Sequence, residues 1–188
     1  MITMRQDAQQ NRQKILTTAN QLFREQTAAN VTMAQLAKAA QVGVGTLYRN
    51  FPTKGDLFLA LAYDQLGSYV SQQRAYLTTH PLDRPALKHA LRAYLAFREN
   101  RYQVLPKGSL EPASQYYQRP DYQDLVHLFA DLIQGADPQL APAAVTFKAD
   151  MLIAFFRSDS YALQRDVRHY SETEILDQVM TILFPVSS

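Results

Sequence analysis

The hydrophobic residues of this 188-residue chain recur every three or four positions along most of its length. Such spacing places them on one face of an α-helix, and no stretch shows the convincing alternation of apolar and polar residues that a half-buried strand requires. The pattern predicts an all-α protein of about nine helices, without internal repeats or low-complexity segments. The first helix is expected at roughly 7–26, with an apolar face of Ile15, Leu16, Ala19, Leu22 and Phe23.

Two short helices are expected next. Thr32, with Gln35 three residues later, has the pattern of a capping box that opens a helix, and this helix runs to about residue 39. The following helix begins near Gly43 and ends by residue 51, because Pro52 drives the residue before it out of the helical conformation. The two helices are therefore joined by a very short turn.

The rest of the chain contains longer helices. Thr53 with Asp56 caps a fourth helix, and the polar stretch TTHPLDRP at 78–85 is the first clear linker. Ser171 with Glu174 has the pattern of a second capping box. Residues 106–121 are the least regular segment and hold either a loop or a short helix. The later helices are expected over 86–105, 122–134, 142–157 and 172–184.

Charge is distributed unevenly, although the net charge is only +2. Residues 1–54 contain seven basic and two acidic residues, and the remainder contains 12 basic and 15 acidic residues. A basic segment on an acidic body suggests that the basic segment meets a polyanion. We expect an N-terminal domain at 1–54, a connecting helix from about 54 to 77, and a C-terminal domain at 78–188.

Several classes of protein are disfavoured by what the chain lacks. It has no cysteine, which excludes disulfides, thiolate metal sites and a cysteine nucleophile. Its four histidines show no metal-binding spacing, and there is no G-x-S-x-G nucleophile elbow. The polar start does not resemble a signal peptide, and the apolar run MLIAFF at 151–156 is too short to span a bilayer. We expect a soluble, cytoplasmic protein that is not an enzyme and uses no cofactor or metal.

The stretch VGVGTLYRNF at 42–51 places Gly43 and Gly45 at the start of a helical pattern. One explanation is a phosphate-binding loop, but a dinucleotide fingerprint requires glycine at the position of Tyr48 and a preceding strand. A Walker motif fails too, because Lys54 is not preceded by glycine. Two short helices joined by a glycine-containing turn are instead typical of the helix-turn-helix, whose second helix enters the major groove of DNA.

Residues 12–58, with Thr32 and the run AQLAKAAQVGVGTLYRNFPTKGDLF, closely resemble the DNA-binding domain of the TetR family of transcriptional regulators. The remaining helices agree in number and length with that family's ligand-binding and dimerisation domain. The resemblance implies that phosphates are bound at Thr32, Tyr48 and Lys54, and that the start of the second short helix meets the bases. The DNA-contacting residues so implied are Thr32, Val44, Gly45, Thr46, Tyr48, Arg49, Asn50 and Lys54.

Two positions depart from the family pattern. Gln41 stands where glycine is usual, at a turn position expected to have a positive φ, which costs a non-glycine residue about 1 kcal/mol. Gly43 replaces the usual capping serine and is a weaker cap. Val44 and Gly45 cannot donate hydrogen bonds from a side chain, so specificity is expected to depend on methyl contacts with thymine, on Thr46 and Asn50, and on DNA shape.

The C-terminal domain is expected to form a two-fold dimer that matches a palindromic operator. The helices at 142–157 and 172–184 are the expected dimer surface, as they are in the TetR family. The alternative is that the apolar stripe of the last helix only closes the core of the protomer. The candidate dimer residues are Ile175, Leu176, Val179, Ile182 and Leu183.

The middle helices are where the TetR family binds a small-molecule effector. Aromatic residues there are candidates to line an apolar pocket, with Arg98 or Arg157 orienting an anion, although aromatics at helical spacing are often ordinary core. The irregular segment with Tyr116 and Tyr117 is a candidate portal. The pocket candidates are Tyr94, Phe97, Arg98, Tyr102, Tyr116, Phe129, Phe155 and Phe156.

Four functions remain to be weighed. The sequence favours a repressor that binds operator DNA as a homodimer and is released by a small-molecule effector of unknown identity. The alternatives are an activator or regulator without an effector, a relative that has lost DNA binding, and a small helical enzyme. The enzyme is the least favoured, because paired acidic residues such as Glu172 and Glu174 suit the start of a helix.

Overall fold

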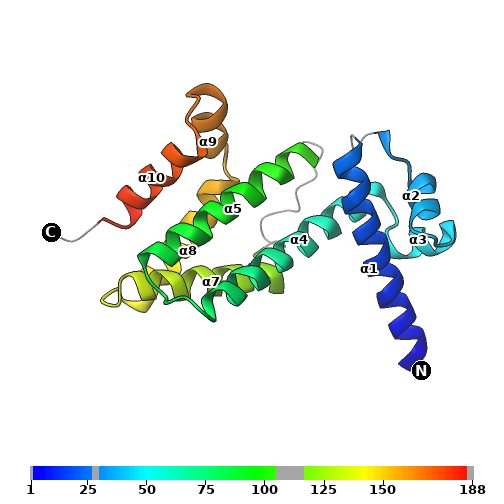
Figure 1. Cartoon of the computed structure of the whole chain (residues 1–188), viewed down its shortest axis with the longest axis horizontal. Coiled ribbons are helices and arrows are strands. Elements are labelled where there is room, and N and C mark those ends of the chain that lie inside the picture. Colours follow the sequence, from blue (N-terminus) through cyan, green and yellow to red (C-terminus); the bar gives the residue numbers. More distant parts are fainter. Residues whose placement is uncertain (1, 27–29, 105–116, 186–188) are drawn as a thin grey trace. The chain divides into compact units, whose positions relative to one another are not determined.

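The computed structural model describes residues 2–26, 30–104 and 117–185. Within these ranges the chain forms nine α-helices and one short π-helical segment and has no strand, which confirms the predicted all-α fold (Figure 1). The π-helical segment, Leu163–Val167, directly follows α9. The α-helices are α1 (Ile2–Glu25), α2 (Met33–Ala39), α3 (Val44–Asn50), α4 (Lys54–Leu77), α5 (Arg84–Val104), α7 (Pro120–Ala136), α8 (Pro142–Arg157), α9 (Asp159–Ala162) and α10 (Glu172–Leu183).

The chain divides into two compact units. The first contains Met1–Gln65 with Arg101–Glu111, and the second contains Leu66–Asn100 with Pro112–Ser188. Helices α4 and α5 therefore each pass from one unit into the other. Each unit has a hydrophobic core of its own, and the two are described separately below.

The core of the first unit is shared by its first three helices, since α1 packs against α2 and α3, and α2 packs against α3. Leu47 of α3 is fully buried there, together with Leu36 and Ala37 of α2. Helix α1 begins earlier than predicted, because its first turns are polar and give no periodic signal. Its predicted apolar face is confirmed and consists of Ile15, Leu16, Ala19, Leu22 and Phe23.

Side-chain caps define several helix ends. The capping boxes predicted at Thr32 and at Ser171 are both present. At the start of α4, the hydroxyl of Thr53 accepts the backbone N–H of Asp56 at 3.1 Å, as predicted. Helix α5 begins inside the predicted linker at Arg84, because Asp83 accepts the N–H of Ala86 at 2.9 Å and so acts as an unforeseen cap.

Aromatic rings from four helices meet inside the second unit. The ring of Tyr94 on α5 packs edge-on against Phe129 of α7 and Phe156 of α8, at centroid distances of 5.5 and 5.9 Å. Tyr69 of α4 lies 5.5 Å from the same ring, and its hydroxyl donates to the carbonyl of Ala90 at 2.9 Å. Burial, and then the neighbouring Tyr94, raise the pKa of Tyr69 well above its ordinary value.

Gly135 allows α7 to approach the loop before α5 very closely. A Cβ atom at this position would lie 2.4 Å from the carbonyl oxygen of Leu82, which is shorter than any real contact. Only glycine therefore fits without movement of the backbone. The opposite case is Gly67 in α4, where an added Cβ meets no atom within 4 Å.

The segment between α8 and α10 was not predicted to contain structure. It forms α9 and the π-helical segment, held to α5 by Glu99, which accepts hydrogen bonds from Tyr161 and, at 2.9 Å, from Arg165. Burial, and then the hydrogen bond to Glu99, raise the pKa of the buried Tyr161 above its ordinary value. These partners are more than 60 positions apart, so local periodicity could not reveal them.

Candidate DNA-binding surface and effector region

The turn between α2 and α3 has the hydrogen bonds of a Schellman motif. The N–H of Gln41 donates to the carbonyl of Lys38 at 3.1 Å, and the N–H of Val42 donates to the carbonyl of Ala37 at 3.0 Å. Gln41 occupies the left-handed position of the motif with a φ of 52°, which confirms the positive φ expected there. Gln41, one of the two residues that depart from the family pattern, thus bears the backbone strain of this turn.

Helix α3 begins with two glycines that are not left-handed. Gly43 is its N-cap, with a φ of −63° and no side-chain cap, and its carbonyl accepts the N–H groups of Thr46 and Leu47 at 2.9 and 3.0 Å. At Gly45, a Cβ atom would meet nothing within 4 Å. The fold of this unit therefore does not explain Gly45.

The outward side of α3 is apolar at its start and polar at its end. Val44 and Tyr48, one turn apart, are 48% and 47% exposed. Arg49 folds back along the helix, where it donates to the carbonyl of Gly45 and to the hydroxyl of Thr46, both at 3.2 Å. Asn50 similarly donates to the carbonyl of Thr46 at 2.9 Å. Arg49 and Asn50 are thus both held by carbonyl groups of their own helix.

Thr32 and Lys54 flank this helix pair. The Thr32 hydroxyl takes part in the α2 capping box with Gln35. The Lys54 ammonium donates to the carbonyl of Val31 at 2.6 Å and lies 5.7 Å from the centroid of the Phe58 ring. Lys54 therefore ties the start of α4 to the segment that leads into α2, a structural contact that the sequence did not suggest.

Arg12 of α1 was not singled out from the sequence as a site residue. Its guanidinium lies 4.6 Å from the centroid of the Phe51 ring and donates to the carbonyl of Asn50 at 3.4 Å. A cation is favourable at the C-terminus of a helix, where the last carbonyls lack partners. Arg12 thereby fixes the end of α3 against α1. Its partners are 38 and 39 positions away, and no local signal marks them.

Both the helix-turn-helix and the full chain have counterparts among known proteins. Residues 15–61 match the family model described as bacterial regulatory proteins, tetR family. Over 171 residues, the chain is 31% identical to the HTH-type transcriptional regulator SAB2452 of Staphylococcus aureus, an alignment that covers 89% of both chains. The chain belongs to the TetR family. This TetR-family protein is a DNA-binding transcriptional regulator.

Solved structures of the same fold extend the match beyond the helix-turn-helix. Thermus thermophilus FadR in complex with lauroyl-CoA aligns with a TM-score of 0.61 and 20% identity, over 94% of this regulator and 95% of that chain. Bacillus subtilis FadR in complex with stearoyl-CoA aligns with a TM-score of 0.60 and 12% identity, over 93% and 99%. At these identities the similarity establishes the shared fold, an N-terminal helix-turn-helix followed by a helical C-terminal part.

The candidate dimer residues of the regulator divide into two groups. Ile175, Leu176 and Val179 are buried within the protomer. Ile182 is 71% exposed, and Leu183 is half-buried. On α8, Phe147 is 65% exposed. The exposed apolar side chains therefore differ from most of those predicted.

The candidate effector residues mostly form the aromatic interior described above. Tyr94, Phe129 and Phe156 are fully buried, with the Tyr94 ring against the other two, whereas Phe97 and Phe155 are half-buried. Arg98 is buried, and its Nε donates to the Phe156 carbonyl at 3.2 Å. Arg157, the other candidate to orient an anion, is half-buried at the end of α8. Two further candidates lie outside what the structure describes. Tyr116 falls in a range that is not described, and Tyr102 is described by its backbone alone.

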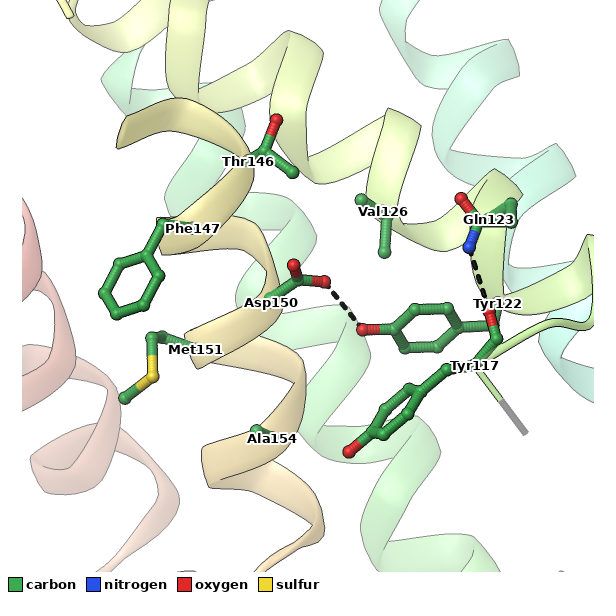
Figure 2. Close-up of a pocket in the computed structure, with 9 residues that line it drawn as sticks. All are labelled: Tyr117, Tyr122, Gln123, Val126, Thr146, Phe147, Asp150, Met151 and Ala154. Atoms are coloured by element: carbon green, nitrogen blue, oxygen red, sulfur yellow. Dashed lines mark hydrogen bonds between the residues drawn. The ribbon is translucent and has the colours of Figure 1, made fainter. Parts of the chain in front are cut away.

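A groove between α7 and α8 involves different residues. Its volume is about 510 Å³, and Tyr117, predicted as part of a portal, is among its lining residues. Figure 2 shows Asp150 of α8 pointing toward Tyr122 of α7, whose hydroxyl donates to Asp150 at 2.7 Å. The groove is lined by Tyr117, Tyr122, Gln123, Val126, Thr146, Phe147, Asp150, Met151 and Ala154.

Three further observations concern the described residues only. None of their helices is long and apolar enough to cross a membrane. No three or more acidic or histidine side chains among them are grouped so that they could hold a metal ion. The amide oxygen of Gln73 on α4 is buried and accepts no hydrogen bond from the described part of the chain.

Proposed function

We propose that this regulator is a repressor that binds a palindromic operator as a homodimer and is released by a small-molecule effector. The observation that carries the proposal is the start of α3, where Gly45 has open space in front of it and lies between the exposed Val44 and Tyr48. A short helix with an unobstructed, partly apolar first turn suits close approach to base edges in a major groove.

The proposed DNA contacts have two kinds of role. Tyr48 and Lys54 bind phosphates and thereby position the helix, as does Thr32 at the start of α2. Val44 and the Thr46 methyl group contact thymine methyls, while Gly45 permits the close approach. Arg49 and Asn50 reach the DNA by exchanging their intrahelical hydrogen bonds for bonds to phosphates or bases.

We propose that dimerisation uses the exposed apolar side chains of α8 and α10. Ile182 and Phe147 are the most exposed large apolar residues in the described part of the chain, and Leu183 is half-buried beside Ile182. Three of the predicted residues are buried in the protomer and therefore lie beneath the proposed dimer surface, namely Ile175, Leu176 and Val179. An Ile182→Glu variant is expected to shift the protein toward monomers in analytical ultracentrifugation.

The proposed domains are a DNA-binding domain at 1–54, a connecting α4, and an effector-binding and dimerisation domain at 78–188. The passage of α4 from one compact unit to the other supports the connecting role. Tyr69 of α4 contacts Tyr94, which also contacts α7 and α8, so ring movements in the interior are coupled to the connecting helix. Ligands in the FadR structures are acyl-CoA molecules, which supports a small-molecule effector here. Such a regulator acts on chromosomal DNA in the cytoplasm.

The described residues offer two candidate effector sites, which are the aromatic interior of the second unit and the groove between α7 and α8. The sequence-predicted residues Tyr94, Phe97, Arg98, Phe129, Phe155 and Phe156 pack together, so a ligand among them has to separate rings that now touch. The amide oxygen of Gln73, which accepts no hydrogen bond from the described residues, gives this unit a buried acceptor that a ligand can use. The groove between α7 and α8 is already open.

The test of DNA binding is a footprint on the DNA that flanks the regulator's own gene, repeated over a range of salt concentrations. We expect protection of a palindrome, and at least a tenfold loss of affinity with a shallower salt dependence in the double variant Tyr48→Phe, Lys54→Ala. Lys14→Ala, which removes an exposed charge from α1, is the matched control and should bind nearly as well as the wild type.

The result that contradicts these contacts is an unchanged affinity and salt dependence in the double variant. Because Lys54 also bonds to the Val31 carbonyl, the helical content and melting curve of the variant must be shown to match the wild type. Transcription of the flanking genes should rise when the regulator is deleted. A fall would identify an activator instead.

A further inference from the structure

Among the described residues, the groove between α7 and α8 carries one charge without an ion-pair partner. Asp150 is the only charged residue among the described residues that line it. One of its oxygens accepts the Tyr122 hydroxyl, and no basic side chain of the described residues forms an ion pair with it. Asp150 is half-buried, where an opposite charge interacts with it more strongly than in bulk water.

Two aromatic side chains lie near Asp150 in this groove. The rings of Tyr117 and Tyr122 meet edge-on at a centroid distance of 5.1 Å and lie together on the α7 side of the groove (Figure 2). Phe147 and Met151 of α8 also line it, but their side chains project from the side of α8 that faces away from Tyr122 (Figure 2). Faces of aromatic rings attract cations.

We propose that this groove binds an organic cation that carries aromatic or alkyl groups, and that such a cation is the effector. The charge pairs with Asp150, and the hydrocarbon part lies against Tyr117 and Tyr122. The volume of about 510 Å³ is within the range of small-molecule sites. An anion such as an acyl-CoA would face the carboxylate and is disfavoured here. The inference rests on the small-molecule effector proposed above.

The test uses tetraphenylphosphonium as a probe, measured by titration calorimetry on the full chain. Asp150→Asn keeps the size of the side chain and an acceptor for the Tyr122 hydroxyl but removes the charge. We expect this variant to bind the probe at least tenfold more weakly than the wild type. Tetraphenylborate has the same shape and the opposite charge, and Asp150→Asn is not expected to weaken its binding.

Asp124→Asn is the matched control, because Asp124 is an exposed carboxylate of α7 that does not line the groove. It should leave the affinity for the probe within about twofold, as expected for an exposed charge outside the site. Equal binding of the probe by the wild type and Asp150→Asn would overturn the proposal. Binding only by the Ile182→Glu variant would also overturn it, because a second copy of the chain would then cover the groove.

The effect on operator DNA separates this inference from the repressor proposal. In the wild type, saturating probe should weaken operator binding at least tenfold, and in Asp150→Asn the same concentration should have a markedly smaller effect. Probe binding without any effect on the operator would overturn the effector role. The footprint without the probe tests operator binding by itself. A failure of the repressor proposal can therefore be distinguished from a failure of the cationic-effector proposal.

Discussion

The helix-turn-helix and the α7–α8 groove depend on contacts of very different reach along the chain. In the first unit, the turn is closed by hydrogen bonds from Gln41 to Lys38 and from Val42 to Ala37. In the second, Tyr122 and Asp150 are 28 positions apart, and Arg98 bonds to a carbonyl 58 positions away. A motif whose contacts join residues that are close in the sequence can be recognised from the sequence. A site whose residues come from several helices cannot.

The two units also expose apolar side chains in different settings. Val44 and Tyr48 stand at the start of a short helix in a basic segment, which suits a polyanionic partner that presents thymine methyls. Phe147 and Ile182 stand on longer helices in an acidic part of the chain, which suits a partner protomer. An exposed apolar side chain therefore indicates a kind of partner only when the charge and geometry of its surroundings are considered with it.

The largest expected effect breaks the long-range packing of the second unit. Gly135→Ala should lower the free energy of unfolding by about 2–3 kcal/mol, because the new Cβ would overlap the Leu82 carbonyl. Gly67→Ala is the control, and its open surroundings should make it neutral or stabilising by up to about 1 kcal/mol. Urea unfolding followed by circular dichroism measures both. Equal stability of the two variants would contradict the contact with Leu82.

The next effect separates folding from DNA binding in the first unit. Gly45→Ala should stabilise α3 by up to about 1 kcal/mol, because alanine is the better helix former and its Cβ meets open space. The same change should reduce operator affinity about tenfold, equivalent to about 1.4 kcal/mol, if the backbone approaches DNA closely here. Thermal melting and a gel-shift titration measure the two quantities. Undiminished affinity would show that Gly45 does not serve close approach.

A third prediction concerns the strained turn. Gln41→Gly should raise the free energy of unfolding by about 1 kcal/mol, because glycine adopts the observed φ of 52° without steric cost. Gln41→Ala retains the Cβ and should give no such gain. Chemical denaturation of both variants provides the comparison. If alanine stabilised as much as glycine, the left-handed conformation would not be the cause.

The smallest effect tests a long-range contact at the surface of the second unit. Lys88 pairs with Asp177 at 2.7 Å, but both side chains are largely exposed to solvent. Lys88→Ala should therefore cost only about 0.5 kcal/mol, and the loss should shrink as salt is added. A cost several times larger, independent of salt, would mean that this pair anchors α10 to α5.

The caps show where sequence reasoning works best. Thr32 with Gln35 and Ser171 with Glu174 were predicted as capping boxes, and both are present. The positive φ at Gln41 was predicted from the turn position alone. Each of these features depends on a few consecutive residues, so composition at fixed offsets is sufficient to reveal it.

The contacts that escaped prediction depend on side chains brought together by the fold. Lys54 was considered for its charge, but only the fold brings its ammonium to the Val31 carbonyl. Arg12 reaches the end of α3 for the same reason. Tyr161 and Arg165 are fixed by Glu99 on a distant helix. Periodicity shows that a residue faces inward or outward but does not name the neighbour that it meets.

The sequence by itself determined that the protein is helical, that it has a helix-turn-helix near its N-terminus, and that it resembles TetR-family regulators. These properties are encoded in apolar spacing, caps and turn residues, whose physical effects act within about one or two helical turns. Only the tertiary structure decided that Ile175, Leu176 and Val179 face the protomer's own core, and that Asp150 shares a groove with Tyr117 and Tyr122. The reason is that packing chooses which faces of distant helices meet.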